Sequence, residues 1–254
     1  MAKGTTTKKI ILSKIPTRAP ENLEKKRAKK ISEARFREIA DLQNLMAAEG
    51  KHSLLIIFQG MDGSGKDGAT RNLFRYCTPA GIDVVSFKKP TDEEFAHDFL
   101  WRVHKRTPAK GTIAIFNRSH YEDILIQRVH GWIDNTRVKK RMAAINAFED
   151  LLQFDNNTTV LKFYLHISKE QQELELQERI DEPEKHFKHN PGDWEERKHW
   201  DKYRTAYEYA INNSTTPWHI VPVDQRWYRD YVMSEIIVNT MKSFKMKYPP
   251  LEKE

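Results

Sequence analysis

The chain has 254 residues, of which 39% are hydrophobic, so it is long and apolar enough to bury a core of domain size. A single cysteine, Cys77, excludes an intramolecular disulfide and a metal cluster built from cysteines, which is typical of a reducing compartment. No apolar run approaches the ~18 residues that cross a bilayer, so we expect a cytoplasmic protein that has no membrane partner.

The formal net charge of +7 is concentrated at the start of the chain. The first 30 residues contain ten Lys or Arg and two Glu, so the rest of the chain is close to neutral. Residues 1–20 hold two prolines and no sustained periodicity, which predicts a basic extended arm without packed structure, ahead of a single domain over residues 21–254. Such an arm is more typical of a solvated segment than of a polyanion grip, and we expect no nucleic-acid partner.

Helical and strand patterns alternate along that domain. Apolar positions follow helical spacing over residues 22–48, and Gly50 supplies a stop. Residues 54–58 form a continuous apolar run, the pattern of a strand buried on both faces of a parallel sheet. Similar runs recur at residues 82–87, 112–116, 159–165 and 219–223. Because helical segments separate these runs, we predict an α/β domain with a parallel sheet covered by helices on both faces.

A long polar segment precedes the last strand pattern. Residues 168–213 predict helices, with breaks at Asp181-Glu182-Pro183 and at Asn190-Pro191-Gly192. A helical excursion at this point is typical of a lid that closes over a ligand, although an ordinary surface hairpin of helices has the same pattern. Residues 227–247 predict a closing helix.

A glycine-rich motif follows the first strand directly and reads Gly60-Met61-Asp62-Gly63-Ser64-Gly65-Lys66-Asp67-Gly68. In this Gly-x-x-x-x-Gly-Lys pattern, backbone N–H groups and the start of a helix cradle phosphate oxygens, and the lysine adds a mobile charge. The setting of strand, loop and helix makes the motif much more specific than the letters alone. We therefore expect phosphates to be bound by Gly63, Ser64, Gly65, Lys66, Asp67 and Gly68.

Two carboxylates distinguish this loop. Asp67 occupies the position after the lysine, where a Ser or Thr ligand of magnesium is usual, and Asp62 lies inside the loop. Carboxylates beside phosphates would repel them unless a hard cation lay between, so the sequence predicts Mg²⁺, or Mn²⁺ in its place, with Asp62 as a ligand. Asp67 is equally well explained as an acid favoured in the first turn of a helix.

A dense polar segment follows the third strand pattern. The strand ends in Asn117, where an acid that helps to hold the metal is usual, and Arg118-Ser119-His120-Tyr121-Glu122-Asp123 comes next. Because ligands bind at the carboxyl ends of strands in such sheets, we expect Arg118 to stabilise charge on a transferring phosphoryl group. Pairing with a neighbouring acid is the alternative for this arginine. His120 receives no chemical role, since a lone histidine beside a tyrosine is more often a packed side chain.

Four ordered elements together resemble the polyphosphate kinase 2 family, and the resemblance spans about residues 20–245. They are the glycine-rich motif at 60–68, Phe-Asn-Arg-Ser-His-Tyr-Glu-Asp at 116–123, Arg-Val-His-Gly at 128–131, and a segment at 179–203 that is similar to the family's helical lid. The resemblance implies a thymidylate-kinase-like P-loop kinase fold. It also implies in-line, reversible phosphoryl transfer between inorganic polyphosphate and an adenine nucleotide, AMP or ADP, that forms ADP or ATP.

In that family, polyphosphate lies in a basic channel under the lid, the nucleotide approaches from the other side, and Mg²⁺ joins the two. Carried over by position, Asp62 would bind metal, Lys66 and Arg118 would hold the transferring phosphate, and Arg128 and Arg179 would contact phosphates. The lid residues implied for the chain of phosphates are Lys185, Lys188, Arg197 and Lys198. Residues 178–204 carry seven Lys or Arg but eight acids, so the net charge of the lid gives no separate support.

Asn117, His120 and Glu122 stand where many members of the family carry Asp, Trp and Asn. This pattern is similar to the class III subgroup, which accepts AMP and ADP, and it makes Glu122 a candidate to shape acceptor choice. Further candidate metal ligands are Asp67, Asn117 and Glu122. The resemblance also implies a homodimer or homotetramer. An ATP-dependent nucleoside or nucleotide kinase and a nucleic-acid-stimulated P-loop NTPase are the alternatives that the glycine-rich motif leaves open.

Overall fold

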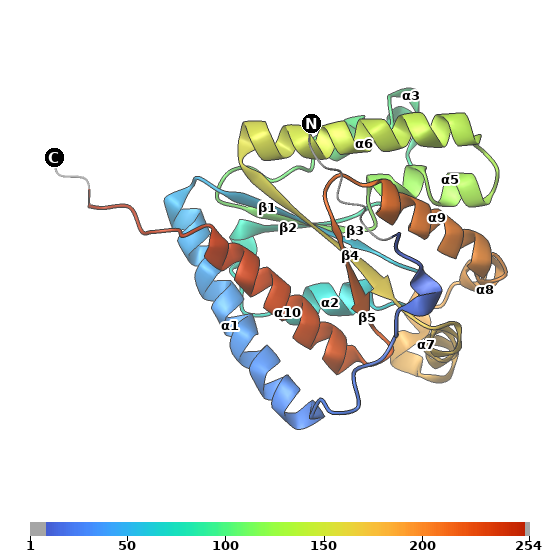
Figure 1. Cartoon of the computed structure of the whole chain (residues 1–254), viewed down its shortest axis with the longest axis horizontal. Helices are drawn as coiled ribbons and strands as arrows, with labels where there is room; N and C mark the ends of the chain where they lie inside the picture. Colours follow the sequence, from blue (N-terminus) through green and yellow to red (C-terminus); the bar gives the residue numbers. More distant parts are fainter. Residues whose placement is uncertain (1–8, 252–254) are drawn as a thin grey trace.

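Five parallel strands form one sheet at the centre of the computed structural model, which describes residues 9–251 (Figure 1). They are β1 (Ser53–Gln59), β2 (Ile82–Ser86), β3 (Ile113–Asn117), β4 (Thr158–His166) and β5 (Trp218–Pro222). Their order is β2-β3-β1-β4-β5, with β1 in the middle and all of its residues buried. The predicted parallel α/β sheet is therefore confirmed, and the central run at residues 54–58 is buried as the sequence predicts.

Helices cover both faces of this sheet (Figure 1). The helices α1 (Lys25–Glu49), α2 (Lys66–Leu73) and α10 (Arg226–Ser243) lie on one face, and α6 (Asn135–Asn156) and α9 (Trp200–Asn213) lie on the other. Short helices α3 (Asp92–Ala96), α4 (Trp101–His104) and α5 (Ile126–Val129) connect the strands. The first helix ends where the sequence predicts, because Gly50 adopts a left-handed conformation and its N–H donates to Met46 O. None of the helices within residues 9–251 is long and apolar enough to span a bilayer.

The register of β1 brings two loops together. Phe58 pairs with Asn117 on β3 and with Phe163 on β4. The loop after β1 and the segment after β3 therefore leave the sheet side by side at its carboxyl edge. The chain after β1 leads to strands on one side of it, β2 and β3, and then to strands on the other side, β4 and β5. In α/β sheets, ligands bind at the point where the strand order changes side in this way.

The second strand departs from the prediction. It lies at the edge of the sheet with β3 as its neighbour, and Asp83, Val84 and Ser86 are exposed. Val84 retains 48% of its surface. The prediction that the run at residues 82–87 is buried on both faces is therefore wrong, since an apolar run does not reveal whether its strand is central or at an edge.

Residues 9–20 are packed against the body of the protein. Leu12 is fully buried in the core. The backbone N–H of Ile10 donates to Asn212 Oδ1 at 2.8 Å, and that of Leu12 donates to Glu208 Oε1 at 2.8 Å. The expectation of an unpacked arm is therefore wrong for this part, because α9 offers acceptors to its backbone. Residues 1–8 of the expected arm lie outside the described residues.

The segment between β4 and β5, called the lid segment (residues 168–213), is helical as predicted. It contains α7 (Lys169–Asp181), a 3-10 turn (Pro183–Lys188), α8 (Pro191–Arg197) and α9. The breaks fall at the predicted positions. Asn190 starts α8 because its Oδ1 accepts from Gly192 N at 3.0 Å, and Pro191 occupies the first turn.

Candidate active site

The glycine-rich loop joins β1 to α2, and two of its glycines cannot be replaced without strain. Gly65 has φ +83°, and a Cβ there would lie 2.6 Å from Arg229 Nη1. Gly60 has φ +154°, and a Cβ there would lie 2.7 Å from Leu165 O. Both positions require glycine because the backbone of the loop runs so close to its neighbours. The result is a tight turn of the form that the motif predicts, and we call residues 60–68 the phosphate loop.

Lys66 folds back over this loop. Its Nζ donates to Gly60 O at 2.9 Å and to Met61 O at 3.1 Å. Burial, followed by the charge of Arg118, lowers the pKa of Lys66 to about 8, although the carboxylates nearby oppose the shift. Lys66 is thus protonated at neutral pH but close to its titration range.

Arg118 and Asp62 meet at the carboxyl edge of the sheet. Arg118 leaves β3 with φ +62°, a conformation that costs a non-glycine residue roughly 1–3 kcal/mol, and its N–H donates to Phe58 O at 3.0 Å. The guanidinium contacts Asp62 Oδ1 directly. Burial opposes its charge, but Asp62 and Glu122 outweigh burial and raise the pKa of Arg118. The side chain keeps 40% of its surface, so it pairs with an acid and is also open to a ligand.

Glu122 stands behind this pair on a 3-10 turn (His120–Asp123). The turn starts at Ser119, whose Oγ accepts from Tyr121 N at 3.2 Å. With its amide oriented to satisfy its neighbours, Gln59 donates to Glu122 Oε1 at 3.0 Å. Burial raises the pKa of Glu122, although Arg118 and Lys66 oppose the rise. Glu122 is therefore held in place from β1 while it remains near the Asp62–Arg118 pair.

Asn117 links the end of β3 to the first turns of α2. Its Oδ1 accepts from the Thr70 hydroxyl at 3.0 Å, and its Nδ2 donates to Asp67 Oδ1 at 3.0 Å. Asp67 is therefore oriented by Asn117. An acid at position 117 would repel Asp67. The amide at position 117 therefore compensates for the acid at position 67, and both residues depart from the usual pattern.

A groove lined by ten Lys or Arg and five Asp or Glu runs from the phosphate loop to the lid segment, and we call it the basic groove. Its volume is about 620 Å³. Lys66 and Arg118 line it beside the phosphate loop, Lys88 and Lys89 come from the loop after β2, and Arg71 comes from α2. The excess of cations makes this groove attractive to a polyanion.

Two of the four predicted lid cations, Lys185 and Lys188, line the basic groove together with Arg179, which was predicted to contact phosphates. Arg179 and Lys185 are held by acids. Arg179 contacts Asp193 Oδ2 at 2.5 Å. Lys185 pairs with Glu178 at 2.7 Å and Lys188 lies near the ring of Phe187, with Nζ 5.4 Å from its centroid. The acids of the lid segment orient its cations on the wall of the groove. The net charge of the segment therefore does not reveal whether its cations face a ligand.

The other predicted cations lie elsewhere. The Arg128 guanidinium stacks over Tyr209, with Cζ 4.7 Å from the ring centroid, and it does not line the basic groove. Lys198 is exposed and pairs with Glu195 at 2.6 Å. Arg197 ties α8 to α7, since its Nη1 donates to Lys169 O at 2.6 Å. Of the predicted cations, these three are therefore the ones that the structure does not bring into the groove.

A second hollow, the aromatic cavity, opens on the other side of the Asp62–Arg118 pair. It has a volume of about 260 Å³ and is lined by Trp200, Tyr203 and Tyr207 of α9 together with Glu122 and Arg197. The basic groove and the aromatic cavity share Asp62, Arg118, Asn190 and Asp193 in their walls. The Asp62–Arg118 pair therefore stands between a cationic groove and an aromatic cavity.

Arg229, on α10, is a groove residue that the sequence analysis missed. It is 2% exposed, its Nη1 donates to Gly65 O at 3.0 Å, and its Nε donates to Asp230 Oδ1 at 2.8 Å. It therefore supports the phosphate loop from behind. No local pattern announces this role, because the loop and the arginine are separated by most of the chain.

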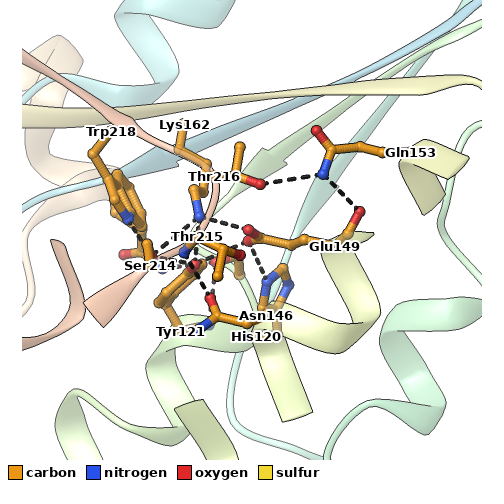
Figure 2. A network of polar contacts seen from close by, with 12 residues as sticks. His120, Tyr121, Asn146, Glu149, Gln153, Lys162, Ser214, Thr215, Thr216 and Trp218 are labelled. Atoms are coloured by element: carbon orange, nitrogen blue, oxygen red, sulfur yellow. Dashed lines mark hydrogen bonds and ion pairs between the residues drawn. The ribbon is translucent and has the colours of Figure 1, made fainter. Parts of the chain in front are cut away.

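A buried polar network lies directly behind the 3-10 turn that carries Glu122 (Figure 2). Lys162 Nζ donates to Glu149 Oε2 at 2.5 Å and to the Tyr121 hydroxyl at 2.7 Å, and the Tyr121 hydroxyl donates to Glu149 Oε1 at 2.9 Å. Lys162 and Glu149 are both 0% exposed. Ser214, just after α9, accepts from Lys162 at 3.1 Å. The network therefore joins β4, α6 and the end of the lid segment to the turn that carries Glu122.

His120 belongs to the same network. Its Nε2 lies 3.3 Å from Glu149 Oε1, and the ring is fully buried. Burial lowers the pKa of His120, so the ring is neutral at physiological pH. His120 is therefore a packed, hydrogen-bonded side chain, as the sequence predicts.

The similarity of this chain to known proteins extends over nearly its whole length. The family model described as Polyphosphate kinase 2 (PPK2) matches residues 22–249. An AMP/ADP-polyphosphate phosphotransferase of Meiothermus ruber is 47% identical over 219 residues, which cover 85% of this chain and 82% of the relative. An ADP-polyphosphate phosphotransferase of Rhodopseudomonas palustris is 38% identical over 257 residues, which cover 95% of this chain and 89% of the relative.

A solved structure shows the same fold. The crystal structure of polyphosphate kinase 2 from Arthrobacter aurescens superposes with a TM-score of 0.93 at 36% sequence identity. The match covers 99% of this chain and 91% of that chain. The similarity therefore includes the sheet, the phosphate loop and the lid segment.

Proposed function

Because this chain belongs to the polyphosphate kinase 2 family, we propose that it transfers a phosphoryl group between inorganic polyphosphate and AMP or ADP, forming ADP or ATP reversibly. The relatives named as AMP/ADP- and ADP-polyphosphate phosphotransferases support this reaction. The observation that carries the proposal is the place of the Asp62–Arg118 pair, which lies at the phosphate loop between the basic groove and the aromatic cavity.

Polyphosphate occupies the basic groove in this proposal. A chain of phosphates offers only repeated negative charge, and the groove presents an excess of cations from the phosphate loop, α2, the loop after β2 and the lid segment. Arg179, Lys185 and Lys188 would contact the chain. The nucleotide approaches from the aromatic cavity, whose rings give a base a surface on which to stack.

The donor set fits a magnesium ion shared with substrate, and Mn²⁺ could replace it. Within residues 9–251 no group of three or more His, Cys, Asp or Glu could hold a metal, so the protein does not form a complete cage. Mg²⁺ is commonly held by one or two carboxylates plus substrate phosphates, and Asp62 faces both hollows. Asp67 and Glu122 are further candidates, with Asn117 orienting Asp67. The bound ion would neutralise phosphate charge between the two polyanions.

The chain's own residues position and neutralise the transferring group. Lys66 and Arg118 hold its oxygens, and the phosphate loop fixes the leaving chain, so attack by the nucleotide proceeds in line without a covalent enzyme intermediate. The lid segment excludes water from the two hollows. Without that exclusion, the same residues would promote hydrolysis of polyphosphate.

The lowered pKa of Lys66 gives a pH dependence. The free enzyme loses the Lys66 proton as pH rises through about 8, so kcat/KM for polyphosphate should fall above that pH. Bound phosphate stabilises the ammonium, so the alkaline limb of kcat should lie at higher pH. The pH dependence of the rate at limiting polyphosphate measures kcat/KM, and the pH dependence at saturating polyphosphate measures kcat. The role of Lys66 would be contradicted if kcat/KM did not fall at alkaline pH. It would also be contradicted if kcat and kcat/KM fell at the same pH.

Glu122 is proposed to favour AMP as acceptor. Glu122→Gln keeps the shape and the contact with Gln59 but removes the charge, and we expect kcat/KM for AMP to fall about tenfold more than that for ADP. Parallel assays with the two acceptors measure the ratio. An unchanged ratio would remove this role from Glu122.

One assay separates the proposed reaction from its alternatives. Purified protein is incubated with Mg²⁺, long-chain polyphosphate and AMP or ADP, without ATP, and new ADP and ATP are expected. An ATP-dependent nucleotide kinase would need added ATP, and a nucleic-acid motor would hydrolyse ATP faster with DNA or RNA. The same preparation, analysed by light scattering, tests the homodimer or homotetramer that the family resemblance implies.

A further inference from the structure

A third hollow adjoins the basic groove on the side of the N-terminal segment, and we call it the distal hollow. It has a volume of about 700 Å³ and lies between the start of α1, the end of α2, α7 and the start of α10. These helix ends gather at one side of the molecule (Figure 1). The distal hollow and the basic groove share Asn72, Glu175, Glu178 and Arg226 in their walls, so a long ligand could pass from one to the other.

Three cations of the distal hollow have no acidic partner. Arg18, Lys25 and Lys29 line it, and within residues 9–251 no carboxylate lies within ion-pair distance of any of them. Lys25 and Lys29 are one helical turn apart on α1, and Arg18 comes from the packed segment before that helix. Cations from two separate segments therefore converge on one wall.

Four of the five acids of the distal hollow are paired with cations. Glu175 and Glu178 contact Arg226 at 2.6 and 2.8 Å, and Glu178 also contacts Lys185 at 2.7 Å. Asp230 pairs with Arg229 at 2.7 Å, and Glu33 pairs with Arg75 at 3.5 Å. The fifth acid, Asp224, has no cation within ion-pair distance among residues 9–251, and it accepts from the Thr17 hydroxyl at 2.7 Å and from Ser168 N at 2.8 Å. Three unpaired cations therefore face one unpaired carboxylate, so the unpaired charge of the distal hollow is positive.

The first turn of α1 contains no acidic residue, although the positive end of the helix dipole favours acids there. Lys25 lies in this turn, where the dipole disfavours its charge, and it has no acidic partner. A bound polyanion would stabilise this charge.

We propose that the distal hollow is a second subsite for polyphosphate, in which Arg18, Lys25 and Lys29 hold the part of a long chain that extends beyond the basic groove. This inference rests on the proposed function. Polyphosphate chains short enough to end within the basic groove do not reach these residues. The distal hollow therefore sets the preference for long polyphosphate and does not affect the transfer of the terminal phosphoryl group.

The double variant Lys25→Ala/Lys29→Ala tests the subsite, because alanine favours the helix and both side chains are exposed. With ADP as acceptor, KM for long-chain polyphosphate should rise about tenfold, which corresponds to ~1.4 kcal/mol of lost binding. The KM for tripolyphosphate, the KM for ADP and kcat should stay near wild type. Arg18→Ala should shift the same KM in the same direction without altering α1.

Lys139→Ala/Lys140→Ala is the matched control, since these exposed lysines of α6 carry the same charge and line none of the three hollows. The proposal would be overturned if the Lys25→Ala/Lys29→Ala variant raised the KM equally for long-chain polyphosphate and tripolyphosphate. It would also be overturned if the control variant raised the KM for long chains by the same factor, or if only the KM for ADP changed. Wild-type protein that makes no ATP from either long chains or tripolyphosphate would instead overturn the proposed function.

Discussion

Arg118→Ala should lower kcat for phosphoryl transfer from polyphosphate to ADP about a thousandfold, since an arginine that stabilises the transferring group contributes ~10³-fold or more in this reaction class. The side chain lies between the two hollows and pairs with Asp62, so its loss removes a planar donor from the point where the substrates meet. Steady-state ATP formation at saturating substrates measures the effect.

Two further variants make this result specific. Arg118→Lys keeps the charge but not the fork of donors, so it should recover only part of the rate. Arg204→Ala removes an arginine of α9 whose partner is Asp201 at 2.9 Å on the surface, and it should behave as wild type. A loss of less than tenfold in Arg118→Ala would remove Arg118 from the reacting centre.

Lys162→Met should lower the free energy of unfolding by about 3–5 kcal/mol, because it leaves the Glu149 carboxylate buried without its cation. Both side chains are 0% exposed and their contact measures 2.5 Å. Although burial opposes ionisation of Glu149, hydrogen bonds from His120 and Lys162 lower its pKa overall, so the carboxylate is charged in the folded protein. Urea denaturation followed by circular dichroism measures the loss.

The double variant Lys162→Met/Glu149→Leu provides the control. Replacing both charges with apolar side chains is often neutral or stabilising for a buried pair, so the double variant should recover part of the lost stability. The recovery is incomplete because the buried His120 Nε2 loses Glu149 as its partner. A single variant that loses less than about 1 kcal/mol would show that the pair is not buried and charged as described.

The central fold could be predicted because its signals are local. The run at residues 54–58 and the glycine-rich motif sit next to one another in the sequence, and together they fix the middle strand, the phosphate loop and the start of α2. The helices of the lid segment follow from the breaks that the sequence shows at Pro183 and at Asn190-Pro191-Gly192. Each of these features depends on residues only a few positions apart.

The missed features depend on contacts between distant segments. The exposure of β2 follows from its place in the strand order, and the packing of residues 9–20 follows from acceptors on α9. Arg229 reaches the phosphate loop from the last helix. None of these contacts leaves a local pattern that the sequence alone could reveal.

One missed feature did leave a signal. Lys162 interrupts an otherwise apolar strand at residues 159–165, and a lysine in a buried strand needs a partner of opposite charge. The partner, Glu149, could not be identified from spacing, because it lies on α6. The sequence could therefore indicate a buried polar network near the turn at His120–Asp123, but it could not identify the members of that network.

The most direct test of the whole account compares wild type with Asp62→Ala and Lys66→Ala in ATP formation from long-chain polyphosphate and ADP with Mg²⁺, each variant first shown to unfold as cooperatively as wild type. We expect ATP from the wild-type protein and almost none from either variant. A wild-type protein that forms no ATP, or variants that form it at the wild-type rate, would contradict the account.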